Sequence, residues 1–497
     1  MEQAGPDESH VDVAVVGGGV AGTYVASRLT DQRPDWRLAL FESAGRTGGR
    51  LLSLRLPELK ERVAELDAMR FRTSQPLVTA LVAELGLRTR PFLTVHEGNH
   101  FFLRGSRWCA GAPDDAAAAY HLAEDERGLS PGQLLVEAFD RVVPGAIALD
   151  DDDWADVKKE YRFRGRLLHD WSMRDVLAGV LSPEGHRYVV DGFGYSTLLE
   201  ERNAADGIPW VLIETRPESE NRTLVDGLEQ IPRELARRFV ASGGKVYLEY
   251  ELVAFEHDGD SFRLRFKGQP DVLARRVILA LPRCALELVS QGAPLLASAE
   301  TRSLISSVAA HPAAKLFLAY ANAWWREHGF DGLRAVCDLP LSKLYYFDES
   351  DASTRRDQAA LLLASYSDGD HAAAWRAMSA RKRMPPDSAP FDSDFRWRAY
   401  AATEDQVREA QRQLRALHRT TEIPDPIASA FIDWGSVPFA GAWHVWNVGV
   451  RSWEVMPRIT QPAPSERLYI CGEAYSWSQG WVEGALESAE RVLARIT

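Results

Sequence analysis

The spacing of apolar residues near the N-terminus predicts a strand, a helix and a second strand in succession. Residues 11–16 (VDVAVV) form a short apolar run rich in β-branched side chains, which is typical of a buried strand. Residues 20–29 carry apolar side chains at helical intervals, and residues 37–41 form another short apolar run. This order indicates a βαβ unit in an α/β domain with a parallel sheet.

Helical patterns dominate the next part of the chain. A helix is expected from Pro76, and further helices are expected over residues 131–143 and 157–190. The four aspartates at 150–153 predict a solvated loop between these two helical stretches. Ser172 has the position of an N-cap residue for a helix that begins just after it. The core-facing side of the helix from Pro76 should carry Leu77, Leu81, Val82 and Leu85.

Residues 191–195 (DGFGY) end this helical part of the chain. They could line a substrate entrance, and a glycine-rich turn with two buried aromatic residues explains them equally well.

Strand patterns return in the second half of the chain. The turn Asp258-Gly259 predicts a hairpin between the runs on either side of it. A helix with a Thr403/Gln406 capping box is expected over residues 403–417, and a surface loop over residues 379–394. Because strands recur so late, the domain that contains the βαβ unit should be assembled from separated segments. The expected strands cover residues 245–250, 252–257, 262–266, 275–281 and 312–320.

Glycines with the spacing G-x-G-x-x-G connect the first strand to the first helix. They are Gly17, Gly19 and Gly22, and they would bring backbone N–H groups and a helix N-terminus against a pyrophosphate. Glu42 ends the second strand twenty residues after Gly22, where an acid can bind a ribose 2′-OH. An ordinary glycine-rich turn is the alternative, but strand, helix, strand and acid in register favour a site for an adenosine diphosphate group.

Composition restricts the class of protein. The 497 residues are 45% hydrophobic and 26% charged, which is typical of a large globular enzyme. The net charge of −13 opposes binding to nucleic acid and to anionic membranes. The four cysteines lack metal-site spacing, so no metal is expected, and they suggest a reducing compartment. The polar N-terminus and the absence of a long apolar run predict a cytoplasmic protein.

Two further segments carry a resemblance to a known family. Residues 43–50 (SAGRTGGR) follow Glu42 directly, and residues 468–474 (LYICGEA) precede Gly480-Trp481 and a C-terminal helix. Together with the βαβ unit, these segments resemble the flavin amine oxidase family, in its L-amino acid oxidase branch. The resemblance touches both ends and several internal segments, so it covers essentially the whole chain.

The resemblance implies an α/β fold with a Rossmann-like FAD-binding domain built from discontinuous segments, a mixed α+β substrate domain and a helical domain. FAD-binding segments are expected at residues 9–58, 216–300 and 441–497. The substrate domain is expected at residues 59–125 and 301–440, and the helical domain at 126–215.

The resemblance also implies which residues bind FAD. Trp443 stands where related monoamine oxidases attach flavin through a cysteine, so the FAD should be non-covalent. Cys471, at the end of a strand, is expected to be a buried small apolar residue. Trp434 belongs to a group of tryptophans that are core residues by default, although a wall facing the flavin is the sharper hypothesis. The expected FAD-binding residues are Gly17, Gly19, Gly22, Glu42, Ser43, Arg46, Gly49, Arg50, Met69, Arg70, Val253, Trp434, Glu473, Gly480, Trp481, Val482 and Ala485.

Five residues are expected at the substrate. The segment around Arg70 (ELDAMRF) and the tyrosine pair at 345–346 resemble parts of L-amino acid oxidases that bind the substrate carboxylate, and the role is assigned to Arg70 and Tyr346. A structural ion pair is the alternative for Arg70. By the same resemblance Lys315 should hold a water at the flavin N5, although protection of a sheet edge is the alternative. Trp481 should form a wall of the pocket, and the Gly480 carbonyl should receive the amino group.

The function implied is FAD-dependent oxidative deamination of an L-amino acid, with dioxygen as acceptor and hydrogen peroxide as product. Three alternatives stay open, namely a flavin amine or polyamine oxidase, an amino-acid monooxygenase that forms the amide, and a flavin-binding scaffold. The sequence does not identify the amino acid, although the abundance of aromatic residues slightly favours large apolar or aromatic substrates. The sequence leaves the oligomeric state undetermined, although a homodimer is common among such enzymes.

Overall fold

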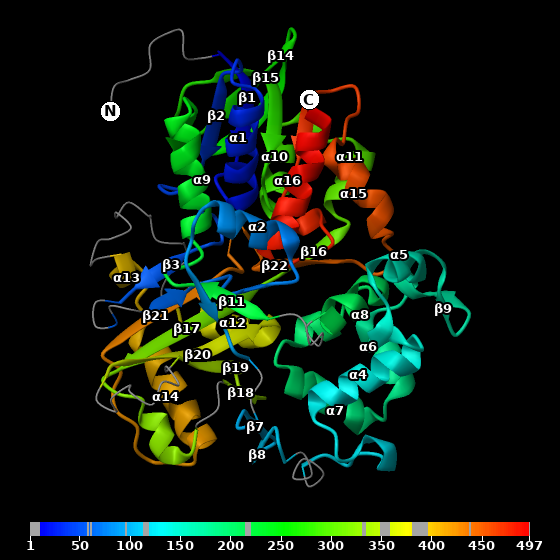
Figure 1. Ribbon diagram of the computed structural model, residues 1–497, viewed down its shortest axis with the longest axis vertical. Helices are drawn as coiled ribbons and strands as arrows, with labels where there is room; N and C mark the ends of the chain where they lie inside the picture. Colours follow the sequence, from blue (N-terminus) through cyan, green and yellow to red (C-terminus); the bar gives the residue numbers. More distant parts are fainter. Residues whose placement is uncertain are drawn as a thin grey trace.

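The computed structural model describes residues 10–56, 59, 62–94, 97–112, 119–213, 220–330, 334–347, 358–379, 396–436 and 439–496. Figure 1 shows a lobe at the top that contains the βαβ unit, a mixed sheet at the lower left and a block of helices at the lower right. The loop expected over residues 379–394 lies, apart from Ser379, outside the described residues.

The upper lobe is built on a sheet whose strands come from three distant parts of the chain. Strand β1 (His10–Val16) leads through helix α1 (Val20–Gln32) to β2 (Leu38–Glu42), and these strands pair in parallel. The sheet continues from β2 to β12 (Lys245–Leu248) and from β1 to β15 (Val272–Leu279), both in parallel. Strand β23 (Leu468–Ile470) pairs in parallel with β15, and the hairpin β13 (Leu252–Asp258) and β14 (Ser261–Phe266) extends the sheet in antiparallel fashion. The expected βαβ unit and hairpin are therefore confirmed.

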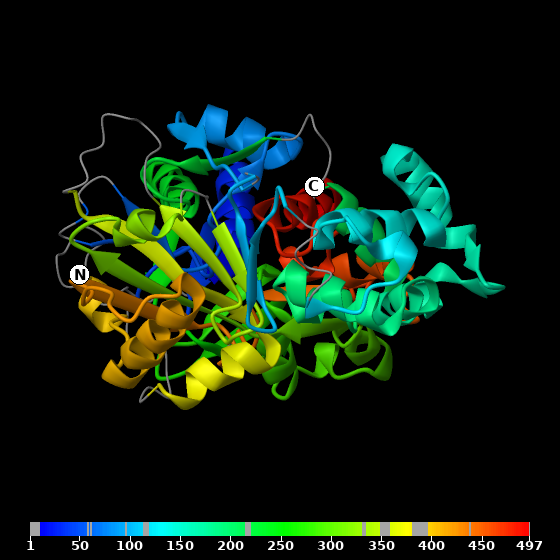
Figure 2. The same ribbon diagram turned by 90° about the horizontal axis from the view of Figure 1, so that it is seen from below.

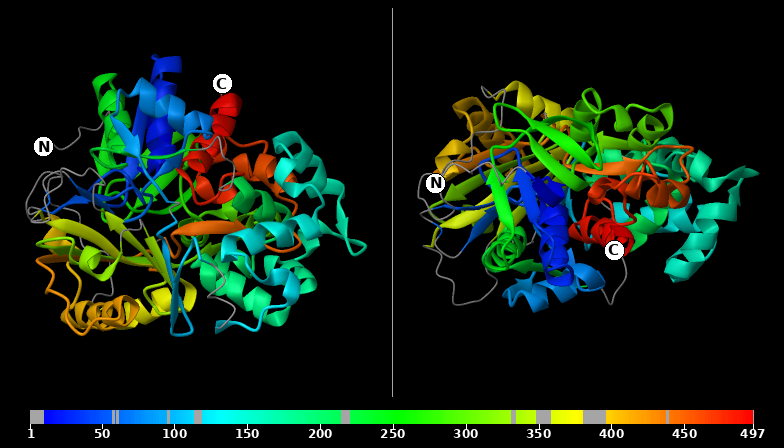
Figure 3. Two further views of the ribbon diagram at one scale, coloured as in Figure 1. Left: turned by 60° about the horizontal axis from the view of Figure 1, so that its bottom comes forward. Right: turned by 90° about the horizontal axis from the view of Figure 1, so that it is seen from above.

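Strand alternation places the two core layers of this lobe on opposite faces of the sheet. Val13 and Val15 face α1, α9 (Gln230–Ala241) and α16 (Val482–Ile496), with α2 (Pro76–Glu84) beside them. Ala14 and Val16 face the layer that contains α10 (Arg283–Ser290), α11 (Ala299–Ile305) and α15 (Ser452–Thr460). From above, α1 lies between α9 and α16 (Figure 3, right).

The lower-left sheet is mostly antiparallel. Its strand order is β21 (Ala428–Asp433), β17 (Ala313–Tyr320), β20 (Ala360–Asp368), β19 (Lys343–Phe347), β18 (Arg334–Cys337), β7 (His100–Leu103) and β8 (Ser106–Cys109). Helices α12 (Gly369–Ala377) and α14 (Glu404–His418) cover one face, and Thr403 caps α14 as expected. The opposite face packs against the chain around Met69 and Trp443.

Short strands connect these parts. They are β3 (Ser53–Arg55) with β4 (Val63–Glu65), β5 (Phe71–Arg72) and β6 (Thr89–Pro91) on β11 (Asn221–Leu224), and β16 (Val308–His311) with β22 (Trp443–Trp446). One turn of helix, α13 (Arg396–Ala399), lies near β3.

The helical block contains α4 (Pro131–Val142), α5 (Asp151–Glu160), α6 (Met173–Val180), α7 (Pro183–Phe193) and α8 (Ala204–Leu212), and Figure 2 shows it beside the lower-left sheet. The capping role of Ser172 is confirmed, since its Oγ accepts a hydrogen bond from the Asp175 N–H. Two expectations were wrong. The acidic run is the start of α5, because Asp150 caps the helix and acidic residues suit its positive end. The helical stretch expected from residue 157 is interrupted by the hairpin β9 (Arg162–Phe163) and β10 (Arg166–Leu167).

Within the described residues, no helix is long and apolar enough to cross a membrane, and no cluster of histidine, cysteine or acidic residues could hold a metal ion. Cys109, Cys284, Cys337 and Cys471 are free thiols, and Cys471 is buried as expected. The bounds of the expected domain segments stay a prediction.

Candidate active site

The glycine loop after β1 is shaped by close backbone contacts. Gly17 has φ +107°, and a Cβ there would lie 2.4 Å from the Ala280 carbonyl oxygen. A Cβ on Gly22 would lie 1.9 Å from the Gly17 carbonyl oxygen, so α1 can approach the loop this closely only with glycine there. A Cβ on Gly19, in contrast, would meet no atom within 4 Å. Gly19 therefore borders open space at the N-terminus of α1, as a phosphate-binding turn requires.

Glu42 lies at the end of β2 beside this loop. Its Oε2 accepts a hydrogen bond of 2.6 Å from the Gly18 N–H, and its Oε1 accepts one of 2.8 Å from the Ala44 N–H. The carboxylate is thus fixed at the carboxyl edge of the parallel sheet, where nucleotides bind in such folds.

A cavity of about 190 Å³, called here the cofactor cavity, runs from this loop to the start of α16. Among the residues at its far end are Ala442 and Phe439 of the loop before β22. Most of the expected FAD-binding residues line it. They are Gly17, Gly19, Glu42, Ser43, Gly49, Arg50, Glu473, Gly480, Trp481, Val482 and Ala485.

Six expected FAD-binding residues do not line this cavity; two of them, Met69 and Arg70, line a second cavity described below, and the other four lie elsewhere. Gly22 packs against the loop from behind, and Arg46 donates hydrogen bonds to the carbonyls of Thr47, Gly49 and Leu51 of its own loop. Val253 is exposed, while the neighbouring residues 250–252 line the cavity. Trp434 is a core residue whose Nε1 donates to the Leu66 carbonyl at 2.9 Å, so the interpretation of it as a flavin-facing wall is not supported.

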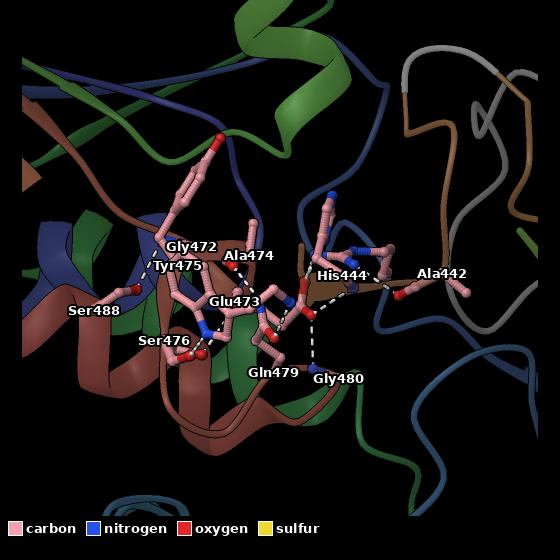
Figure 4. A network of polar contacts seen from close by, with 12 residues as sticks. Ala442, His444, Gly472, Glu473, Ala474, Tyr475, Ser476, Gln479, Gly480 and Ser488 are labelled. Carbon is pink, nitrogen blue, oxygen red and sulfur yellow. Dashed lines mark hydrogen bonds and ion pairs between the residues drawn. The ribbon is translucent and has the colours of Figure 1, made fainter. Parts of the chain in front are cut away.

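Glu473 is the centre of a hydrogen-bond network at the end of the cofactor cavity (Figure 4). Its Oε1 accepts from the Gly480 N–H at 2.6 Å and from the His444 N–H at 3.0 Å. Its Oε2 accepts from Arg50 Nη2 at 3.0 Å and contacts His444 Nδ1 at 2.9 Å. Arg50 also donates to the Ala442 carbonyl. One carboxylate thus joins the loop after β2, strand β22 and the loop before α16.

The neighbours of Glu473 keep its carboxylate ionised. Burial raises the pKa of Glu473, but Arg50 and His444 outweigh it and hold the pKa at about 2. Because a carboxylate only accepts, the Nδ1 of His444 carries a proton, and its Nε2 has no hydrogen-bond partner among the described residues.

A second cavity, called here the inner cavity, adjoins the first. The two share Asp67, Ala68, Gly480, Trp481 and Val482. The remaining residues that line the inner cavity are Met69, Arg70, Tyr195, Leu198, Arg202, Trp210, Tyr366, Trp443, His444 and Gln479. Met69 and Arg70 thus reach the inner cavity rather than the cofactor cavity.

Aromatic residues surround Arg70 in the inner cavity. Its guanidinium carbon lies 5.5 Å from the ring centroid of Trp481 and 5.9 Å from that of Phe92. The ring centroids of Tyr195 and Tyr366 are 5.0 Å apart. Burial raises the pKa of both tyrosines well above the usual value, so their hydroxyls are neutral and can donate hydrogen bonds. Of residues 191–195, considered above as the lining of a substrate entrance, Tyr195 is the one on this cavity.

Tyr346 does not reach this cavity, which corrects its assignment to the substrate carboxylate. Its hydroxyl is 3.1 Å from His418 Nε2, and its ring packs against Trp325 and Phe330 on the other face of the sheet. Successive side chains of a strand point to opposite faces. The neighbouring Tyr345 of β19 therefore faces the side of the cavities, where it contacts Tyr195.

Lys315 is buried on β17 and lies behind the residues that line the two cavities. Its Nζ donates hydrogen bonds to the carbonyls of Glu65, at 3.0 Å, and Asp67, and lies 4.4 Å from the ring centroid of Tyr366. Burial lowers its pKa, and the nearby carboxylates of Asp67 and Glu65 oppose this effect. Burial likewise raises the pKa of Asp67, whereas the positive charges of Arg50 and Lys315 lower it.

Several residues of the inner cavity have no motif that could have marked them. Tyr366 is one polar ring in an apolar strand, and Arg202 stands in an ordinary charged stretch before α8. His444 had a weak signal, since it is a polar residue between Trp443 and Trp446 in an otherwise apolar strand.

Comparison with known proteins identifies the architecture. The model of the family "Flavin containing amine oxidoreductase" matches residues 20–384 and 391–497. The chain belongs to this family. FAD is accordingly its cofactor. The open space beside Gly19 suits the diphosphate of FAD, and the position of Glu42 suits the ribose of its adenosine. The expected fold class is confirmed by a solved putrescine oxidase, with a TM-score of 0.70 at 18% identity over 98% of this chain and 99% of that one.

Individual relatives in the family are distant. Aplysianin-A of Aplysia kurodai is 27% identical over 97% of this chain and 89% of its own length. The L-amino-acid oxidase of Mus musculus is 24% identical over 97% of this chain and 70% of its own length.

Proposed function

We propose that this flavin amine oxidoreductase is an FAD-dependent L-amino acid oxidase, which forms a 2-oxo acid, ammonia and hydrogen peroxide from an L-amino acid, dioxygen and water. The observation that carries the proposal is Arg70, a guanidinium on an inner cavity that meets the cofactor cavity at Gly480 and Trp481. An arginine there suits a substrate carboxylate, which amines and polyamines lack. The similarity to the mouse L-amino-acid oxidase supports the same choice.

Bound FAD would supply the redox chemistry, by taking a hydride equivalent from the substrate Cα and passing electrons to dioxygen. The chain would orient the substrate for this step. Arg70 would pair with the α-carboxylate, and the neutral hydroxyl of Tyr195 or Tyr366 would donate a hydrogen bond to it. Trp443 and Trp481 would form the walls, and the Gly480 carbonyl would accept a hydrogen bond from the amino group.

Lys315 is proposed to assist the reaction with dioxygen. Its ammonium would favour the negative charge that develops on dioxygen during reduction. Its contact with the Asp67 carbonyl supports this role, since Asp67 lines both cavities. Two of its three N–H groups are used by the two carbonyls, so one can serve a water molecule.

Three assays test the proposal. The first measures peroxide release from each L-amino acid and from putrescine and related amines; oxidation of amines alone would refute it. The second identifies the product, because a monooxygenase would form the amide and carbon dioxide instead of a 2-oxo acid. The third is anaerobic addition of amino acids, which would leave the yellow colour of a flavin-binding scaffold unchanged.

Dioxygen as acceptor, a homodimer and a cytoplasmic location stay predictions. The negative net charge supports the expectation that neither nucleic acid nor an anionic membrane is a partner.

A further inference from the structure

Arg202 is a second arginine on the inner cavity, and it is 1% exposed. Its backbone is fixed on two sides, because its carbonyl accepts from the Met173 N–H and its backbone forms a bridge with Asn447 after β22. Its guanidinium carbon lies 4.8 Å from the ring centroid of Trp210. The side chain is therefore held in place before any ligand binds.

The guanidinium of Arg202 has an unsatisfied hydrogen-bond donor among the described residues. Its Nε has no hydrogen-bond acceptor among the described residues. Burial lowers the pKa of Arg202, the carboxylates of Asp206 and Glu473 raise it, and the resulting pKa is about 10. The guanidinium therefore stays charged at neutral pH. Asp206 Oδ1 is contacted by Lys158 Nζ at 3.1 Å and Ser452 Oγ at 3.0 Å, and Asp206 Oδ2 has no hydrogen-bond partner among the described residues, so Asp206 acts on Arg202 as a nearby charge without a hydrogen bond to it. A buried cation with an unsatisfied donor and no hydrogen-bonded carboxylate is costly, which indicates that a bound group normally completes it.

Other donors on the inner cavity are also unused. The Nε1 groups of Trp443 and Trp481 have no hydrogen-bond partner within the described chain. Among the described residues that line the cavity, the carboxylate is that of Asp67, which lies at the end shared with the cofactor cavity and interacts with Arg50 and Lys315. Among the described residues, the cavity thus offers two guanidiniums and two unpartnered indole N–H groups against one carboxylate, so it suits a ligand with two anionic groups.

We infer that Arg202 binds the side-chain carboxylate of the substrate while Arg70 binds its α-carboxylate, so that the substrate class is the acidic L-amino acids. The inference rests on the proposed function and names its substrate. A cationic side chain, as in lysine, would meet repulsion from Arg202, and an apolar one would leave the buried charge without a partner. The aromatic walls of the cavity therefore do not indicate an aromatic substrate.

The test compares isosteric substrates that differ in charge. The parent holoenzyme should oxidise L-glutamate with at least tenfold higher kcat/KM than L-glutamine, or L-aspartate than L-asparagine, with L-lysine oxidised least. Arg202→Met should lower kcat/KM for the preferred acid at least 100-fold, mainly through KM, and change the value for its amide less than fivefold. Arg202→Lys, which keeps the charge, should recover part of the loss. Arg174→Met, which removes an exposed arginine from the same helical block, should change neither.

Each contrary result is informative. Equal oxidation of acid and amide by the parent would overturn the assignment. An Arg202→Met variant in which kcat/KM falls equally for both substrates would also overturn it, because an equal loss indicates a structural role for Arg202 beside Asp206. If Arg202→Met does not fold, binding of glutarate and pentanoate to the parent holoenzyme, followed by the shift in flavin absorbance, decides the question. Glutarate should bind at least tenfold more tightly, and equal binding refutes the inference. Failure to oxidise any L-amino acid would refute the proposed function, whereas oxidation of neutral ones alone would refute only this inference.

Discussion

Replacement of Glu473 by glutamine tests whether its network positions the FAD site. The amide oxygen of the Glu473→Gln side chain could still accept from the N–H groups of Gly480 and His444, but its NH₂ would face Arg50 and the protonated Nδ1 of His444. Hydrogen bonds to charged groups contribute about 1.5–3 kcal/mol each. The pKa shift of Glu473 from 4.5 to about 2 corresponds to about 3 kcal/mol. The substitution therefore removes about 3 kcal/mol of favourable interaction free energy. Part of this loss lowers the stability of the unliganded protein, and only the remainder weakens FAD binding.

The expected result is a 10- to 100-fold increase in the dissociation constant of FAD, which corresponds to about 1.4–2.8 kcal/mol. Titration of the unliganded protein with FAD, followed by quenching of flavin fluorescence, measures it. Glu84→Gln is the matched control, because Glu84 also pairs with an arginine, Arg28, but is an exposed carboxylate on α2. FAD affinity within threefold of the parent in Glu473→Gln would refute the reasoning, as would an equal loss in Glu84→Gln.

The same network predicts a pH dependence. The pKa of Glu473 is lower in the folded protein than the 4.5 expected of an unfolded chain, so its contribution is fully present above about pH 4.5 and is lost as the pH falls towards 2. The difference in the free energy of unfolding between the unliganded parent and Glu473→Gln, measured by denaturant unfolding, should therefore be constant from pH 8 to 5 and become smaller below about pH 4. A difference that stays the same at pH 3.5 would show that charge is not its cause.

Four further substitutions have expected outcomes. Gly22→Ala should disrupt the fold of the unliganded protein, because its Cβ would overlap the Gly17 carbonyl, whereas Gly19→Ala should keep the circular dichroism of the parent and weaken only FAD binding. Arg70→Ala should lower kcat/KM for the best L-amino acid by about one and a half to four decades, since loss of a charge-assisted partner costs about 2–5 kcal/mol; an unchanged value would make Arg70 structural. Lys315→Met should slow flavin reoxidation at least tenfold in stopped-flow measurements while FAD stays bound, and reoxidation at the parent's rate would exclude the proposed role.

The parts of the fold that were predicted from sequence depend on local patterns. The βαβ unit could be predicted because Gly17, Gly19 and Gly22 have fixed steric roles at fixed spacing. The hairpin at Asp258-Gly259 and the caps at Ser172 and Thr403 are likewise local, since a short segment specifies each.

The errors share a cause, which is that local pattern does not report on neighbours in space. The charges at 150–153 suit a solvated loop or the first turn of a helix equally well, and the residues that follow decide between them. The pair Tyr345-Tyr346 is ambiguous in a similar way. A strand presents alternate residues to opposite faces, and only the packing of Trp325 and Phe330 against one face shows which tyrosine is left for the cavity.

Arg202 shows this limit most clearly, because its burial arises where two parts of the chain meet. Its own segment lies between η5 (Ser196–Leu199) and α8 and is as polar as many surface turns. The side chain becomes buried because the helical block docks on the end of β22, through the bridge to Asn447 and the hydrogen bond from the Asn203 N–H to the Trp446 carbonyl. No pattern within residues 196–205 encodes that contact. Because Arg202 does not line the cofactor cavity, a substitution at this position can change the charge of the inner cavity and leave the FAD site unchanged. In this way one flavin-binding framework can accept substrates of different charge.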